Sequence, residues 1–320
     1  MPTNERFTQQ AQTLLNEKLF QTEDLFHGEF SRLSAQFREN FEQVCKEIAK
    51  LQKDGIFGDA AYIEYTMLRT NLINKEYAAD VCIYGEDWYL CKKQRAVGQL
   101  DISVLFQYFD ELWQELLSVR KQYTGKVSAQ EVTEFMMLEA APKFYAYVTK
   151  LCRFSILECV EKDYFKAIKK SPKFEINSGE YMAQTEAVYK ENTEKDRDKI
   201  LLWFADRLKF EYCFEDFSGL DFSGENLSEI DCRYSDFRNA VLKNVDFTDA
   251  NLTCARFCGA DLENADFSYA LLYEADFSGA NLKNAKFDNA FTEAESWEDD
   301  RDKWVRPGFM AANFDGVTRG

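Results

Sequence analysis

The chain has 320 residues and a formal net charge of −17, with 46% hydrophobic and 15% aromatic residues. This composition is typical of a globular protein and excludes a disordered chain, and the length suits two domains that each bury a core. The strong negative charge argues against direct binding to nucleic-acid phosphates. No run of eighteen apolar residues occurs, so we expect no membrane span.

The first residues, MPTNERFTQQ, lack the basic and then apolar pattern of a secretion signal, so we expect a cytoplasmic protein. Nine cysteines are scattered along the chain without any C-x-x-C spacing. An odd number of scattered thiols fits neither a disulfide framework nor a zinc site. We therefore expect reduced cysteines, no metal and no cofactor.

Two helices are expected at the N-terminus. The first is short and covers residues 4–18. The second begins at Thr22, as its cap, and ends at Gly55, because apolar residues recur every three or four positions between them. The only histidine, His27, lies beside this apolar stripe and is interpreted as structural.

The next part of the chain mixes helical and extended patterns. A helix is expected over residues 59–73, followed by a β-hairpin over 77–93 with its turn near 85–87. Helical spacing then resumes over residues 101–123. The region is therefore expected to be mainly helical with one small hairpin.

Ser128 and Glu131 have the spacing of a capping box, in which each side chain satisfies a backbone N–H of the other residue. The helix that they open meets Pro142, which should start or kink the next helix. Residues 174–189 alternate again and predict two short strands around a turn at 177–179.

A last helix is expected over residues 194–209 with Thr193 as its cap. No Gly/Ser/Pro linker follows it, which predicts a rigid junction with the next domain. Leu201, Trp203 and Phe204 are placed to cover the open end of that domain.

From residue 215 to residue 290 an apolar residue stands at every fifth position. Its fifteen centres fall into four sets spaced by twenty residues. The first set is Phe217, Phe237, Phe257 and Phe277, and the second is Phe222, Leu242, Leu262 and Leu282. The third is Leu227, Phe247, Phe267 and Phe287, and the fourth is Cys232, Leu252 and Leu272. A period of five fits neither a helix nor a plain strand, so each unit must stack on copies of itself.

This pattern resembles the pentapeptide-repeat family, as in ANLTCARFCGADLENADFSYALLYEADFSGANLKNAKF. In that family four pentapeptides form one square turn of a right-handed β-helix, with the centre and the preceding small residue pointing inward. The resemblance implies a short quadrilateral β-helix of nearly four coils, whose four faces carry the four sets of centres. With the helical region before it, the expected fold class is α+β with several domains.

The expected domains are a mainly helical domain (1–192), a capping helix (193–214), the β-helix (215–290) and a C-terminal segment (291–320). In that last segment a helix is expected with Trp297 and Trp304 on one face, ended by Pro307. Residues 312–316, ANFDG, match the repeat again. We therefore expect a helical excursion that caps the distal end and then rejoins the coil. The alternative is a homodimer through the two tryptophans.

The residue types indicate binding and not catalysis. With one histidine, no glycine-rich phosphate loop and no G-x-S-x-G, the usual sets of catalytic residues are missing. The favoured function is a non-enzymatic adaptor that binds protein partners with the outer faces of the β-helix. Two outward groups are expected to do so. The first is an aromatic group on the fourth face, with Cys254 between its members and Tyr269 near the adjoining corner (Tyr234, Tyr269, Leu271, Tyr273). The second is an acidic group on the third face, where Lys286 is the one basic residue (Glu229, Asp246, Asp249, Asp266, Asp288). The acidic group would attract a basic partner. Alternatively, the fourth face packs on the chain's own helical domain or C-terminal excursion.

A second hypothesis is mimicry of duplex DNA, as in acidic family members that protect type II topoisomerases such as gyrase. Residues 215–290 hold 15 acidic and 6 basic residues, a net charge of −9. Spread over about 18 Å of rod, this is one charge per roughly 2 Å, close to the ~1.7 Å of DNA. The rod covers only about five base-pair steps, however, which favours the adaptor. A carboxylate-dependent enzyme is the third hypothesis.

Overall fold

The protein is described here from a computed structural model, which describes residues 3–88, 94–123, 125–181, 185–207, 212–292 and 312–318. The chain forms two compact units. The first comprises Met1–Ser171 and Ile176–Val188, and the second comprises Pro172–Glu175 and Tyr189–Gly320.

The first unit begins with one long helix, α1 (Thr3–Lys53), where two helices were expected. The expected start at Thr22 is wrong because Thr22 lies within the buried stripe of the helix, four residues before Phe26. Its hydroxyl donates a hydrogen bond to the Lys18 carbonyl at 2.8 Å, which satisfies it in the helix interior. The apolar stripe therefore continues without a break toward the N-terminus, where Leu15 is also buried.

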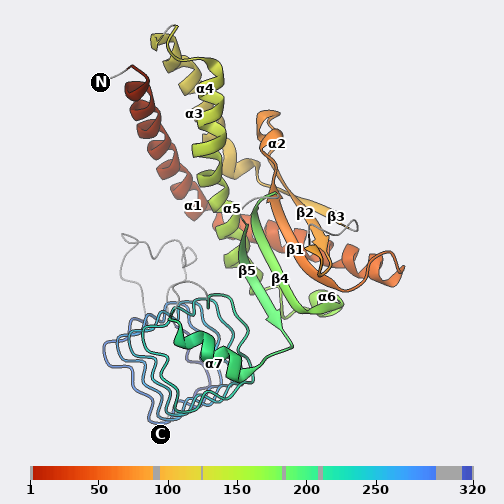
Figure 1. The fold of residues 1–320 in the computed structure, drawn as a ribbon, viewed down its shortest axis with the longest axis vertical. Coiled ribbons are helices and arrows are strands. Elements are labelled where there is room, and N and C mark those ends of the chain that lie inside the picture. The colour runs from red at the N-terminus through yellow and green to blue at the C-terminus, as the bar shows by residue number, and fades with distance from the viewer. Residues whose placement is uncertain are drawn as a thin grey trace. The chain divides into compact units, whose positions relative to one another are not determined.

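A five-stranded sheet, and not an isolated hairpin, accompanies the helices, with the strand order β3-β2-β1-β4-β5 (Figure 1). The strands are β1 (Ala60–Met67), β2 (Ala78–Tyr84), β3 (Arg95–Asp101), β4 (Lys170–Glu180) and β5 (Thr185–Asn192). The expected hairpin is correct for its first strand, β2, but the strand that pairs with it antiparallel is β3, which lies beyond the expected range of 77–93. Residues 89–93 lie outside the described residues. The ends of β4 and β5 belong to the second unit.

Two expectations in the sheet are wrong. The expected helix over 59–73 is strand β1 followed by the short α2 (Arg69–Ile73). Nearly all of β1 is buried on both faces, so it lacks the alternation that distinguishes a strand from a buried helix. The expected turn at 177–179 is instead part of β4, where Ser178 is buried and its hydroxyl lies 3.1 Å from that of Thr149.

The remaining helices of the first unit agree with the sequence in part, because the helix expected over 101–123 is shorter and lies between two 3₁₀ turns, and the short helix Asp163–Lys166 was not expected. They are α3 (Gln107–Val119), α4 (Ala129–Phe135), α5 (Ala141–Ile156) and α6 (Asp163–Lys166), with 3₁₀ turns at Ser103–Phe106 and Arg120–Tyr123 and a π turn at Met136–Ala140. The capping box is confirmed: the Glu131 N–H donates to Ser128 Oγ at 3.1 Å, and the Ser128 N–H donates to Glu131 Oε2 at 2.6 Å. Pro142 lies in the first turn of α5, as expected.

The described helix of the second unit is α7 (Arg197–Ala205), which is shorter than expected. Its cap is Asp196 and not Thr193, because the Lys199 N–H donates to Asp196 Oδ1 at 3.2 Å. The ring of Phe204 lies 5.1 Å from that of Phe217, and Leu201 and Trp203 pack against the same buried cluster. Helix α7 therefore covers one end of the coil, as expected (Figure 1). The rigidity of the junction stays a prediction.

Residues 212–292 and 312–318 form a β-helix of five-residue units. Parallel bridges join residues twenty apart, for example Asp236 to Arg256 and Arg256 to Asp276. Each unit ends in a turn, such as the one closed by the hydrogen bond from the Ala240 N–H to the Phe237 carbonyl at 3.1 Å. The third residue of that turn, Asn239, has a φ of 56°, the left-handed conformation that type II turns require.

The core of the β-helix consists of stacked phenylalanine rings. Phe257 lies 5.1 Å from Phe237 and 4.9 Å from Phe277, with interplanar angles of 7° and 5°. Alanines fill the neighbouring inward positions and leave room for the rings. The buried cluster also includes Tyr212, one unit before the expected start of the repeat.

The described coil continues from Thr292 to Ala312, and residues 293–311 lie outside the described residues. The Ala312 N–H donates to the Thr292 carbonyl at 2.9 Å, and the ring of Phe314 stacks on Phe277 at 5.1 Å and 2°. The expected return of the repeat at 312–316 is thus confirmed. Trp297 and Trp304 lie outside the described residues, so the expected helix and the dimer contact stay predictions.

Candidate partner-binding surfaces

Each five-residue unit has three outward positions: the residue before the centre, the residue after it and the corner residue two after it. The residue before the centre is mostly Asp or Asn, and its side chain accepts a hydrogen bond from the backbone of its own turn. On the third face, the Thr248 N–H donates to Asp246 and the Ser268 N–H donates to Asp266, at 2.9 and 3.0 Å. These carboxylates therefore stabilise the turns, whatever else they bind.

The acidic group on the third face divides into two parts. Lys286 forms an ion pair with Asp266 at 3.1 Å, and the Ser268 hydroxyl together with this ammonium holds the pKa of Asp266 below its usual range. Glu229, Asp249 and Asp288 are exposed instead. Among the described residues, Asp246 and Asp266 stabilise turns, and Asp266 also forms an ion pair. Glu229, Asp249 and Asp288 take part in no such turn or ion pair with described residues, which leaves them available to a partner.

Glu229, Asp249 and Tyr269 are the corner residues of three successive coils, and together they form the third-face corner. The Asp249 N–H donates to the Ser268 carbonyl at 3.0 Å and the Tyr269 N–H donates to the Asp288 carbonyl at 2.9 Å, which fixes the row to the backbone ladder. Neighbouring coils are about 4.8 Å apart. Two carboxylates and the Tyr269 ring, which is 51% exposed, thus follow one another along this corner on a hydrogen-bonded backbone.

The backbone conformation at this corner does not favour Glu or Tyr over other residues. Glu229 and Tyr269 have φ values of 59° and 61°, a conformation that costs an L-residue about 1–2 kcal/mol. Most other corners have Gly or Asn, which adopt it more readily. An exposed Tyr at such a position gains little from burial to offset this cost.

The fourth face does not expose the expected aromatic group. Tyr234 and Tyr273 are only 5% and 1% exposed, Cys254 is buried and Leu271 is half-buried. The expectation is wrong for Tyr234 because its ring stacks on Phe214, which precedes the recognised repeat, at 5.0 Å and 17°. Tyr269 alone of the aromatic group is exposed. Packing of the fourth face on the helical domain or on the C-terminal excursion stays a prediction.

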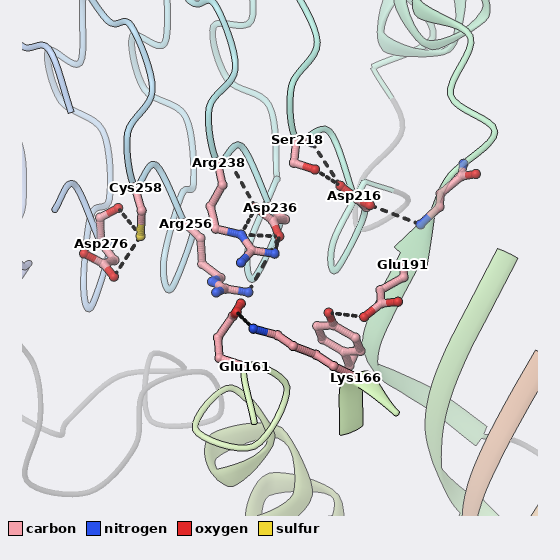
Figure 2. Close-up of polar contacts among 12 residues, drawn as sticks. Glu161, Lys166, Glu191, Asp216, Ser218, Asp236, Arg238, Arg256, Cys258 and Asp276 are labelled. Atoms are coloured by element: carbon pink, nitrogen blue, oxygen red, sulfur yellow. Dashed lines mark hydrogen bonds and ion pairs between the residues drawn. The ribbon is translucent and has the colours of Figure 1, made fainter. Parts of the chain in front are cut away.

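The first face carries a charged column that the sequence did not reveal (Figure 2). The guanidinium Nε of Arg238 lies 2.8 and 2.9 Å from the two carboxylate oxygens of Asp236, and Arg256 approaches the same carboxylate to 3.6 Å. One coil further, the Cys258 thiol donates to Asp276 at 3.0 Å. The sequence does place these residues on one face, because Asp236, Arg256 and Asp276 are twenty apart and Arg238 and Cys258 each follow one of them by two. The spacing alone does not show which charges pair.

A family model for pentapeptide repeats matches residues 226–264 and 260–291, in eight copies. The C-terminal region consists of pentapeptide repeats. No curated protein sequence matches the chain.

Several solved structures of pentapeptide-repeat proteins are similar to part of the chain. HetL, a pentapeptide repeat protein involved in heterocyst differentiation regulation from the cyanobacterium Nostoc sp. strain PCC 7120, is 26% identical over 30% of this chain and 43% of its own, with a TM-score of 0.25. A pentapeptide repeat protein of the Arabidopsis thaliana thylakoid lumen is 37% identical over 24% of this chain and 60% of its own, with a TM-score of 0.14. The chain thus spans only about half the length of these two proteins.

A third similar structure is QnrB1, a plasmid-mediated fluoroquinolone resistance protein. It is 18% identical over 34% of this chain and 82% of its own, with a TM-score of 0.10. At this TM-score the similarity carries no argument about this chain.

Within the described part of the chain, no three His, Cys, Asp or Glu side chains are grouped in a way that would hold a metal ion. The described cysteines are free thiols, and burial raises the pKa of Cys152 to about 12 and that of Cys159 to about 11. Such thiols stay protonated at neutral pH and are poor nucleophiles. Among the described helices, none is long and apolar enough to span a bilayer.

Proposed function

We propose that the protein is a non-enzymatic cytoplasmic scaffold whose pentapeptide repeats bind a protein partner at the third-face corner. In this proposal the repeats form a right-handed quadrilateral β-helix of nearly four coils over residues 215–290. The bridges between residues twenty apart support four units per coil.

The exposed row of Glu229, Asp249 and Tyr269 is the observation that carries the proposal. Tyrosine is enriched among the residues that contribute most to interface affinity, and its ring loses little conformational entropy on binding. The two carboxylates favour a partner with basic residues and speed its approach. Because the backbone of the row is fixed to the ladder, only its side chains have to be ordered on binding.

DNA mimicry is the second candidate, supported by the net charge of −9 over residues 215–290. This net value already counts ion pairs such as Arg238 with Asp236 and Lys243 with Asp261, so the pairs do not change it. The length weakens the candidate, because about 18 Å of rod covers only about five base-pair steps. If the purified protein left both DNA supercoiling by gyrase and its inhibition by quinolones unchanged, this candidate would be rejected.

Co-purification of partners from the native host tests the scaffold. The test variant carries Glu229→Gln, Asp249→Asn and Tyr269→Asn. The matched control changes the corner of the neighbouring second face, with Asn244→Gly, Asn264→Gly and Asn284→Gly. Quantitative mass spectrometry should show partners of the wild type and of the control that are depleted at least tenfold with the test variant. Equal partner lists for the three proteins would reject the third-face corner as the site.

A further inference from the structure

A cavity of about 620 Å³ lies within the second unit, between the ends of β4 and β5 and helix α7. Its size is in the range of about 300–1,000 Å³ that is typical of ligand pockets. Neither the repeat pattern nor the helix predictions indicated it, because its walls come from segments that are far apart in the sequence.

The walls of the cavity are held in place by contacts within the second unit. Lys190 forms an ion pair with Glu215, and although burial alone would lower the pKa of Lys190, this carboxylate raises it. Nearby, Lys195 lies 2.6 Å from Asp216, which also accepts a hydrogen bond from the Asn192 N–H at 3.1 Å. The strand end and the start of α7 are thus tied to the first coil, so the cavity exists before any ligand binds.

The lining of the cavity is acidic on balance. Five carboxylates and three lysines line it, which leaves a formal charge of −2. Glu175, Glu191 and Glu194 contribute to this excess, and Glu191 is oriented by a hydrogen bond from the Tyr189 hydroxyl at 2.9 Å. The N-terminus of α7 also reaches the cavity and would attract an anion, but Asp196 already caps it.

One side of the cavity is apolar. Phe174, Ile200 and Trp203 line it. The Trp203 ring packs edge-to-face on Tyr212 at 4.7 Å, and the Tyr212 hydroxyl donates to the Trp203 carbonyl at 2.7 Å, so the indole is fixed. An aromatic face beside carboxylates attracts a cation through its ring quadrupole as well as through charge. The cavity therefore complements a cationic group on an apolar stem.

We propose that this cavity binds an arginine- or lysine-containing peptide segment of a partner protein, with the cationic group at the carboxylates and the apolar stem against Trp203. This site is separate from the third-face corner and does not depend on the function proposed for it. It would give the protein a second point of contact.

Isothermal titration of the full chain with a defined peptide tests the proposal. The probe is the acetylated and amidated pentapeptide Ala-Arg-Leu-Arg-Ala, and its control has citrulline, an uncharged isostere, in place of each arginine. We expect the arginine peptide to bind and the citrulline peptide to bind at least tenfold more weakly. The proposal is overturned if the arginine peptide does not bind at millimolar concentration, if both peptides bind equally, or if spermine binds with the same affinity as the peptide.

Two variants locate the binding. Glu175→Gln, Glu191→Gln and Glu194→Gln together should weaken binding of the arginine peptide at least tenfold. Asp54→Asn, Asp59→Asn and Glu76→Gln change the charge equally at exposed positions of the first unit and should leave binding unchanged. An equal loss in both variants would show attraction to the acidic chain as a whole, and no loss in the first would place the peptide elsewhere; either result contradicts the proposal.

Discussion

Replacing Tyr269 with Asn separates a binding role from a structural role for the third-face corner. The left-handed backbone at this position costs an L-residue about 1–2 kcal/mol, much of which Asn avoids. About half of the Tyr269 side chain is exposed, so its removal forfeits roughly 1 kcal/mol of burial. The free energy of unfolding of the repeats should therefore stay the same or rise by up to about 1 kcal/mol, while partner binding falls.

The same substitution at Tyr234 is the matched control, because Tyr234 is also a corner residue with a φ of 60°. Tyr234 is buried and stacks on Phe214, so truncation should cost about 3–5 kcal/mol, only partly offset by relief of the backbone. A net loss of roughly 2–3 kcal/mol follows.

Native-state hydrogen exchange of the repeat amides measures these opening free energies without requiring the two units to unfold together. The expected order of stability is Tyr269→Asn equal to or above the wild type, with Tyr234→Asn well below both. If Tyr269→Asn lost 2 kcal/mol or more, the Tyr269 ring would be structural and the assignment of the corner to binding would be wrong.

Two further predictions concern the cores of the two units. Phe257→Leu removes a fully buried ring that stacks on two others. It should lower the opening free energy of the repeats, measured by the same hydrogen exchange, by about 2–3 kcal/mol. A loss below about 0.5 kcal/mol would show that the stack contributes little. In the first unit, burial raises the pKa of Glu23, but His27 and Lys150 lower it from 4.5 to about 2. The stability that the ionised Glu23 contributes is present above pH 4.5 and is lost as the pH falls toward 2. The midpoint of urea unfolding should therefore drop over that range in the wild type and drop less in Glu23→Gln. Parallel pH profiles of the two proteins would contradict this prediction.

The repeat could be predicted because its period imposes one environment on every fifth residue. The sequence correctly predicted that Phe314 lies in the coil, although about twenty residues separate it from the main repeat, because the other residues of ANFDG match the repeat units. Tyr212 was missed because the unit around it lacks the small and polar residues that mark the others. The pattern thus predicts the coil wherever the inward and the turn positions both conform.

Outside the repeat, the sequence predictions were wrong where the local preference of a residue for a cap, a helix or a turn was overridden by burial in the core. Thr22 has the chemistry of a helix cap, but four-residue spacing places it in the buried stripe of α1. Strand β1 is buried on both faces and so has no alternation to read. Ser178 has the chemistry of a turn, yet its hydroxyl finds a buried partner within β4.

The candidate site was predicted only in part for the same reason. The outward direction of Glu229, Asp249 and Tyr269 follows from the period, and the structure brings them into one exposed row. The period gives Tyr234 and Tyr273 the same outward direction, but it contains no information on what covers a face. Exposure depends on packing between distant segments, which no five-residue pattern records.

Site-specific photocrosslinking tests the scaffold function most directly. A benzoylphenylalanine residue introduced at position 269 replaces the exposed Tyr269 ring, and the same residue at position 264 replaces Asn264 on the corner of the second face. After irradiation in the native host, position 269 should give a discrete crosslinked protein whose yield falls when Asp249→Asn is added, and position 264 should not. The same crosslinks from both positions, or none from position 269, would contradict a partner site at the third-face corner.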